Sequence, residues 1–517
     1  MRTESMKENT VIVQGRGQIL IGLMLTMALS AMDSSIVATV VPSIVRDLSG
    51  FSLFPWVFSI YMLTSTVANP IYGKLADLYG RKPLLIIGTI IFLVGSMLCG
   101  LSWSMVSLIV FRGIQGIGAG SIQTLSSTVV GDIYTIEERG RIQGWLSSVW
   151  GISAIIGPAL GGLFAQYASW RWIFYINIPI GILALLMISL RLNEKVERRR
   201  QRIDVLGALL LVLGTGLLIF GLLEGGVSWD WISVPSLVVF VIALLMLVAF
   251  GWWENRVENP IVPLWVFSRR ILSGANLAAG IAGVLTLGLT TFLPTFAQGV
   301  LGFSPTLSGL VLATMSIGWP LASSFSARLY LRIGFRDTAL IGMAFCLISG
   351  IYFVFLPEKA SALIVALGSF IMGIGLGLST TATLVGVQSV VEWNRRGVVT
   401  ASNMFTRSLG STLGTAVFGS ISNSVLAAWI LHAPGQIKSQ IPPTINDVTD
   451  ILGPASHFSA QVIAYVRDGL NFATHNIFWG MVVAAILGLL LLLITPRHFK
   501  KLHFAEDDVQ TQADVSI

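Results

Sequence analysis

Asp33 is the residue best placed to do chemistry, because it alone among the 25 acidic residues lies well inside a long apolar segment. A carboxylate inside a bilayer costs ~2.5–3.5 kcal/mol on insertion scales and persists mainly where function or a partner compensates. A group of this kind is suited to bind and release a proton. No histidine competes for the role, since all five lie outside the apolar segments or at their mouths: His432, His457, His475, His498 and His503.

Arg112 and Gln115 are the expected partners of Asp33. The apolar segment of Asp33 begins near Ile19, fourteen residues earlier, which is ~21 Å along a helix. Arg112 lies seven residues into a segment that starts from the opposite surface, ~10 Å deep by the same arithmetic. The two levels coincide in a core ~30 Å thick. We therefore expect a switchable pair, joined directly or through Gln115 or a water; the alternative is a permanent structural ion pair.

Arg407 is the second cation inside an apolar segment, and no acid lies at its level. Contact with substrate is one interpretation of this residue, and hydrogen bonds to carbonyls or polar side chains are the other.

The elements that must position these residues are membrane-spanning helices. Hydrophobic residues make up 54% of the chain and charged residues 11%, and the mean hydropathy is +0.81, far outside the range of soluble globular proteins. Runs of about 20 apolar residues predict an all-α polytopic membrane protein. Fourteen spans begin near Ile19, Phe54, Pro83, Met105, Ile142, Ile173, Val205, Ile232, Ile271, Ser308, Asp337, Ser361, Val398 and Ala473.

Most of the 32 Lys and Arg residues fall on one side of these spans, which predicts cytoplasmic N- and C-termini. The net charge of +7 is thereby explained by topology. The basic run 198–202 is expected to be a solvated linker that contacts membrane lipids, so no nucleic-acid partner is predicted.

The chain contains an internal repeat. Gly116-Ile-Gly-Ala-Gly120 recurs at 373–377, Arg139-Gly140 at 396–397, and Gly157 and Gly162 at 414 and 419, always 257 residues later. Spans 1–6 and 9–14 are therefore homologous halves, with spans 7 and 8 inserted, and parallel repeats imply two bundles around a midplane cavity.

The repeat divides the chain into seven parts. They are a cytoplasmic N-terminus (1–18), an N-terminal six-helix bundle (19–191), a basic cytoplasmic linker (192–203), inserted helices 7 and 8 (204–253), a second cytoplasmic linker (254–270), a C-terminal six-helix bundle (271–495) that includes an extracellular loop (432–471), and a cytoplasmic tail (496–517).

A charged loop, Gly73-Lys-Leu-Ala-Asp77-Leu-Tyr-Gly80-Arg81-Lys82, joins spans 2 and 3, and a weaker copy occupies 327–336. Gly73 and Gly80 allow close helix approach and a tight turn, and Asp77 can pair with Arg81 or cap a neighbouring helix. The loop is expected to act as a latch; a passive topogenic loop is the alternative.

Span 5 carries Gly144 and then Gly157-Pro158-Ala-Leu-Gly161-Gly162. Small residues at helical spacing beside a proline favour a tight, bendable contact between the bundles. Ordinary small-residue packing is the alternative interpretation.

These segments together resemble the major facilitator superfamily, and specifically its fourteen-helix drug:proton antiporter branch. The charged loop matches G-x-L-A-D-x-x-G-R-K, and Leu108 to Gly118 and the span 5 glycines resemble two further family motifs. Segments 32–42, 170–181 and 292–298 resemble the antiporter branch. Ser153, Ala38 and Leu331 depart from the motifs.

The resemblance implies two six-helix bundles that rock to give alternating access, a role for Arg112 in proton relay, and a loop that holds the cytoplasmic side shut. It also implies a multi-pass protein of the plasma (inner) membrane, acting as a monomer, with no cofactor or metal and with the proton as coupling ion.

The function we expect is drug:proton antiport that exports amphipathic compounds, cationic ones among them. Aromatic and amide residues in the spans, together with one cation, are candidates for the substrate cavity: Tyr61, Gln123, Trp145, Trp150, Asn276, Trp319, Gln388, Asn403 and Arg407. Export or flipping of a lipid or another endogenous amphipathic solute is the alternative, and solute:proton symport is a further one. The sequence has no phosphate-binding G-x-x-x-x-G-K-[ST] loop, no metal-spaced Cys/His cluster and no G-x-S-x-G element, so no enzyme is expected. Cys99 and Cys346 both lie in spans, which argues against disulfides.

Overall fold

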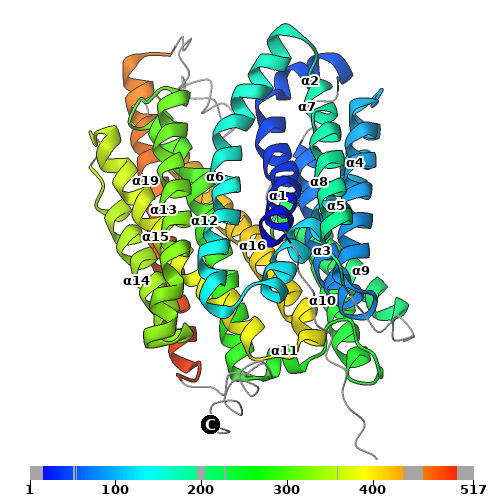
Figure 1. The fold of residues 1–517 in the computed structure, drawn as a ribbon. Helices are drawn as coiled ribbons and strands as arrows, with labels where there is room; N and C mark the ends of the chain where they lie inside the picture. The colour runs from blue at the N-terminus through cyan, green and yellow to red at the C-terminus, as the bar shows by residue number, and fades with distance from the viewer. Residues whose placement is uncertain are drawn as a thin grey trace, which may run out of the picture.

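Two bundles of six long helices make up the architecture (Figure 1). The computed structural model describes residues 15–49, 53, 55–194, 204–225, 229–357, 359–434, 437 and 458–497. The first bundle consists of α1 (Arg16–Thr39), α3 (Pro55–Tyr79), α4 (Arg81–Gly100), α5 (Met105–Ile133), α6 (Ile136–Tyr167) and α8 (Asn177–Arg191). The second consists of α12 (Arg270–Gly299), α13 (Pro305–Ile333), α14 (Phe335–Val354), α15 (Ala362–Ser389), α16 (Arg396–Leu431) and α19 (Ala460–Ile494).

A hairpin of α9 (Val205–Glu224) and α10 (Val234–Glu254) stands between the two bundles in sequence and beside them in space. Helix α9 packs on α3 and on α16: Phe220 lies 5.4 Å from Trp56 between ring centroids, and Phe405 packs against the hydrophobic cluster that contains Leu211. The short elements are the helices α2 (Val41–Leu48), α7 (Trp172–Tyr175) and α11 (Trp265–Ser268) and the 3-10 helix η2 (Trp393–Arg395).

Thirteen of the described helices are long and apolar enough to cross a membrane. Helices suit this setting because they satisfy their own backbone hydrogen bonds, which hydrocarbon cannot do. The long helix outside this group is α3, whose apolar run is interrupted by hydroxyl and amide side chains such as Thr64, Ser65, Thr66 and Asn69. The prediction of an all-helical polytopic membrane protein is confirmed, while the count of fourteen spans and their orientation stay predictions.

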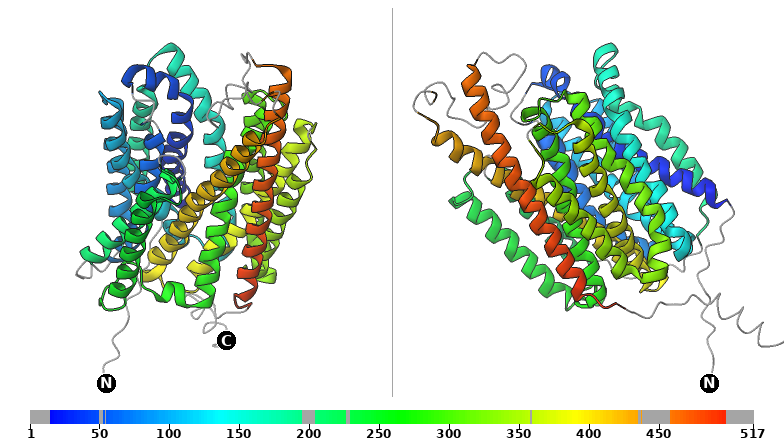
Figure 2. Two further views of the ribbon diagram at one scale, coloured as in Figure 1. Left: turned by 180° about the vertical axis from the view of Figure 1, so that it is seen from behind. Right: turned by 90° about the vertical axis from the view of Figure 1, so that its left-hand side faces the viewer.

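Both ends of the described chain lie on one side of the bundle (Figure 2). The Tyr134 hydroxyl at the end of α5 donates to the Arg16 carbonyl, and Arg497 pairs with Asp337 at the start of α14. An even number of crossings gives this arrangement. We call this side the latch side, after the charged loop of residues 73–82, and the positive-charge bias predicts that it is cytoplasmic.

The internal repeat is visible in equivalent helix contacts. In α5, Gly116 and Gly120 lie against the α3 backbone while Gly118 lies against α4. In α15 the equivalent Gly373 and Gly377 lie against α13, and Gly375 lies against α14. An added Cβ would come within 2.3–2.6 Å of a backbone atom at each of these six positions, so only glycine allows the helices to approach this closely.

One helix boundary adjusts the predicted organisation. Helix α19 begins at Ala460, so residues 460–471 of the segment expected to be an external loop are helical. The apolar run that marked span 14 is only the inner part of a 35-residue helix. Most of the basic linker, 195–203, and most of the predicted tail lie outside the described residues.

Candidate functional site

Asp33, Arg112 and Gln115 meet in the interior of the first bundle as predicted. The Asp33 carboxylate and the Arg112 guanidinium form an ion pair in which both side chains have zero exposure. Arg112 also donates to the Gln115 side-chain oxygen at 2.8 Å, and the Gln115 amide donates to the other carboxylate oxygen of Asp33 at 2.8 Å. The three groups thus form a closed triangle in which each touches the other two.

The surroundings of this triangle come from three further helices. On α3, the Val57 carbonyl accepts from the Arg112 Nε at 3.2 Å, and the Tyr61 ring lies 4.2 Å from the guanidinium carbon. On α8, the Asn177 amide reaches Asp33 at 3.5 Å and donates to Ser96 of α4 at 3.0 Å. The Arg112 Nη2 is buried without a partner among the described residues.

The charges of Asp33 and Arg112 depend on each other. Two buried charges are stable only while they compensate each other, so protonation of Asp33 would leave Arg112 to seek new acceptors, and its unpartnered Nη2 shows that the guanidinium is not yet saturated. Asn177 was quoted in the sequence only as part of a motif and was not assigned to this site. The feature of the sequence that could have pointed to Asn177 is its position at the start of an apolar helix, α8.

Asp77 joins the two bundles on the latch side. Its carboxylate accepts from the backbone N–H groups of Gly397 and Val398, at 2.9 Å each, and so caps the N-terminus of α16 in the other bundle. It also pairs with Arg81 at 2.9 Å. Both expected contacts of Asp77 are therefore made at once, and the helix N-terminus favours the negative charge.

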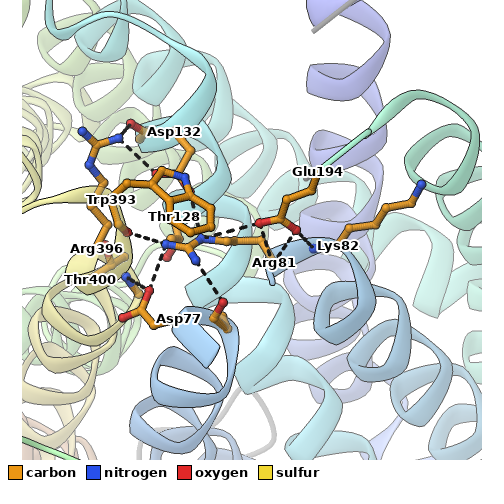
Figure 3. Close-up of polar contacts among 12 residues, drawn as sticks. Asp77, Arg81, Lys82, Thr128, Asp132, Glu194, Trp393, Arg396 and Thr400 are labelled. Carbon is orange, nitrogen blue, oxygen red and sulfur yellow. Dashed lines mark hydrogen bonds and ion pairs between the residues drawn. The ribbon is translucent and has the colours of Figure 1, made fainter. Parts of the chain in front are cut away.

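Arg81 is the centre of the latch, as Figure 3 shows. It is 1% exposed, donates through Nε to Asp132 at 2.9 Å, and lies 3.6 Å over the Trp393 ring of the other bundle. Asp132 in turn accepts from Arg396 at 3.1 Å. Sequence reasoning missed Asp132 and Trp393, because each sits at a helix end next to ordinary loop residues.

Glycine is required in the charged loop and in its weaker copy for backbone conformation or for close helix approach. Gly80 has φ of +96°, a backbone region that favours glycine, and Gly334 in the weaker copy has φ of +94°. Gly73 lies so close to α16 that an added Cβ would come within 2.7 Å of the Gly397 carbonyl oxygen. The Lys82 ammonium extends the other way and donates to the Ser189 carbonyl at 2.7 Å.

Glu194, another residue that the sequence did not single out, holds the start of α4. Its carboxylate accepts from the backbone N–H groups of Arg81 and Lys82 at 2.8–3.0 Å. Burial raises the pKa of this carboxyl, while the two N–H groups and the Arg81 guanidinium act in the opposite direction.

Replacing Glu194 by alanine is expected to lower the free energy of unfolding by about 0.5–2 kcal/mol, the usual cost of losing a helix cap. Thermal unfolding of the purified protein in detergent would measure it. Glu137→Ala is the matched control, because Glu137 is exposed and lies in the first turn of α6. Equal effects of the two substitutions would contradict the assigned role of Glu194.

The span 5 glycines do not all make the expected contact between bundles. Gly144 does, since an added Cβ would lie 2.9 Å from the Pro320 carbonyl oxygen on α13. Gly157 instead faces Ser35 of α1 within the same bundle, Gly161 is buried, and a Cβ added at Gly162 would meet no other described group within 4 Å. Pro158 lies within α6. The bundle contact therefore lies in the first half of α6, on the latch side of the motif.

Five of the predicted cavity residues have other surroundings. Tyr61 belongs to the Asp33 site, and Asn403 donates to Asn276 at 3.2 Å, which ties α16 to α12. Gln388 is 2% exposed and donates across the bundles to the Ser127 carbonyl at 3.1 Å. Trp145 is 50% exposed on the face of α6 that also exposes Ile152, Ile156 and Leu163, which we expect to contact lipid.

Gln123, Trp150, Trp319 and Arg407 remain partly exposed, with no hydrogen bond from their side chains to the described residues. These four are the cavity candidates that the structure leaves available for a ligand.

Comparison with known proteins identifies the family. The sequence model of the Major Facilitator Superfamily matches residues 23–415. The chain belongs to the major facilitator superfamily. This facilitator is 33% identical to Multidrug resistance protein 3 of Bacillus subtilis (strain 168), over 92% of this chain and 94% of the relative. It is also 31% identical to the Multidrug transporter protein MdtP of the same organism, over 93% of each chain.

Solved structures share the fold of this facilitator at low sequence identity. The human organic anion transporter MFSD10 superposes with a TM-score of 0.62 at 13% identity, covering 93% of this chain and 100% of that one. The proton:xylose symporter XylE gives 0.60 at 13% identity, covering 92% and 95%. The expected family is confirmed, and the protein is a multi-pass membrane transporter and not an enzyme.

Proposed function

We propose that this transporter exports amphipathic compounds, drugs among them, across the plasma membrane in exchange for protons. The observation that carries the proposal is Asp33: a carboxylate of zero exposure inside the first bundle, paired with an arginine and hydrogen-bonded by a glutamine. Relatives named as multidrug transporters over nearly the whole chain support drugs as substrates.

The latch supports alternating access. Asp77, Arg81 and Gln388 tie the bundles together on one side of the membrane, through a helix cap, a ring contact and a hydrogen bond. A transporter closed on its cytoplasmic side would load a proton from outside, carry it to Asp33, and release it inside after the latch opens. With one carboxylate of this kind, we expect one proton per cycle.

The decisive experiment is substrate-induced proton movement in proteoliposomes, comparing wild type with Asp33→Asn and using a panel of lipophilic cations, anions and neutral drugs. Proton flux that depends on substrate and disappears in Asp33→Asn is the expected result. Flux that survives the substitution would remove Asp33 from the coupling mechanism. An absence of flux with every drug, in folded wild-type protein, would favour a lipid or another endogenous solute.

A further inference from the structure

Arg407 on α16 of the second bundle is a cation without a partner among the residues that the structure describes. It lies eleven residues from the start of α16, about 16 Å along the helix and therefore near the middle of a ~30 Å hydrocarbon core. Among the described residues its side chain has no hydrogen bond, ion pair or ring contact. Arg112, the comparable cation of the first bundle, has an aspartate, a glutamine and a carbonyl as partners.

The internal repeat shows where Arg407 faces. At the offset of 257 residues its counterpart is Trp150 on α6. Trp150 is five residues beyond the lipid-facing Trp145, about 140° around the helix, and is 38% exposed. Arg407 lies six residues before Leu413, about 120° away around α16. Leu413 is 37% exposed, and at the same offset it is equivalent to Ile156, on the face of α6 that we expect to contact lipid. The side chains of Arg407 and Trp150 therefore belong to the inner faces of equivalent helices, toward the space between the bundles.

The charges around that space are unequal. Asp33 is neutralised by Arg112, and both side chains are fully buried inside the first bundle. Arg407 is partly exposed and has nothing to neutralise it among the described residues. An uncompensated charge at this depth is costly and persists mainly where a ligand or pathway uses it.

We propose that Arg407 binds the anionic group of the substrate, so that the transported compounds include amphipathic oxyanions such as aromatic carboxylates. The guanidinium presents parallel N–H donors that match a carboxylate, sulfonate or phosphate. Trp150 and Trp319, both partly exposed, offer flat apolar surfaces for the rest of such a molecule. This inference rests on the proposed export function and names a substrate class for it.

The charge balance of this exchange differs from that of cation export. One proton entering for one cation leaving moves no net charge, whereas one proton entering for one anion leaving moves two positive charges inward. Export of an anion should therefore be accelerated by a negative interior potential, and export of a matched cation at the same stoichiometry should not.

Three probes with one ring system test the proposal: naphthalene-2-carboxylate, its neutral carboxamide, and 2-naphthylmethylammonium. Binding to purified wild type, Arg407→Gln and Arg407→Lys would be measured by calorimetry. We expect Arg407→Gln to weaken carboxylate binding about tenfold or more, as loss of a charged hydrogen bond implies, with Arg407→Lys intermediate and carboxamide binding unchanged. Unchanged carboxylate affinity in Arg407→Gln, or an equal loss for the carboxamide, would overturn the proposal.

The remaining arms identify the source of the oxyanion and separate the two hypotheses. Competition of phosphatidylglycerol, but not phosphatidylcholine, with the carboxylate in an Arg407-dependent way would assign the site to a lipid headgroup phosphate. Lack of competition would assign it to a free organic anion. Arg407-dependent binding without any Asp33-dependent proton flux would refute proton coupling alone. Proton-coupled export of the carboxamide and the ammonium probe, with no carboxylate binding, would refute the anion inference alone.

Discussion

Replacing Arg112 by leucine is expected to lower the free energy of unfolding by about 3–5 kcal/mol, because it leaves the buried Asp33 carboxylate without its counter-charge. Among the described residues, only the side-chain amides of Gln115 and the more distant Asn177 would still donate to it. The loss should be smaller at low pH, where a neutral acid needs no counter-charge. Thermal and chemical unfolding in detergent would measure it.

Two controls give this result its meaning. Adding Asp33→Asn to Arg112→Leu should restore much of the lost stability, because it removes the stranded charge. Arg171→Leu should cost no more than about 1 kcal/mol, since the pair of Arg171 with Asp47 is partly exposed to solvent. An Arg112→Leu variant as stable as Arg171→Leu would show that the buried pair does not hold the first bundle together.

Replacing Gly73 by valine is expected to force the latch open. An added Cβ alone would come within 2.3 Å of the Ala401 Cβ and 2.7 Å of the Gly397 carbonyl oxygen, and neither of these atoms belongs to a flexible side chain. The α3 and α16 ends must then separate, which also removes the cap that Asp77 provides. We expect at least a tenfold loss of transport, the scale of about 1.4 kcal/mol in a conformational equilibrium.

Distances between spin labels on the latch-side ends of α3 and α16 would report the change directly. The Gly73→Val distribution should shift to longer distances, while Gly309→Ala should leave both the distances and transport unchanged, since a Cβ added at Gly309 would meet no other described group within 4 Å. Unaltered distances in folded Gly73→Val protein would support the alternative in which this loop serves topology only.

The sequence predicted the charged residues of this site but not the uncharged polar ones. Asp33 and Arg112 could be paired because each is a rare charge in an apolar helix, and depth along a helix follows from residue count. Asn177 and Ser96 could not be assigned, because a polar uncharged residue in a span has many possible partners.

The latch shows a different limit. Gly73, Asp77 and Arg81 form a contiguous motif, whereas their partners Trp393 and Asp132 come from loops and helix ends far along the chain. The contact that Gln388 makes could not be predicted because helix faces could not be distinguished. Helix α15 is buried on nearly every side over its second half, so no periodic pattern shows that Gln388 faces the other bundle. The fold was more accessible, since hydropathy and a repeat with constant offset are properties of whole segments.

The position of the α9–α10 hairpin makes the two flanks of the transporter unlike. The bundles meet along α3–α16 on one flank and along α6–α13 on the other, and the hairpin packs only on the former among the described helices. A solute that diffuses laterally within the bilayer therefore meets the α9–α10 hairpin at the α3–α16 flank and no additional helices, among those described, at the α6–α13 flank. Any entry directly from the lipid would be confined to the α6–α13 flank, where Gly144 sets the closeness of the two helices.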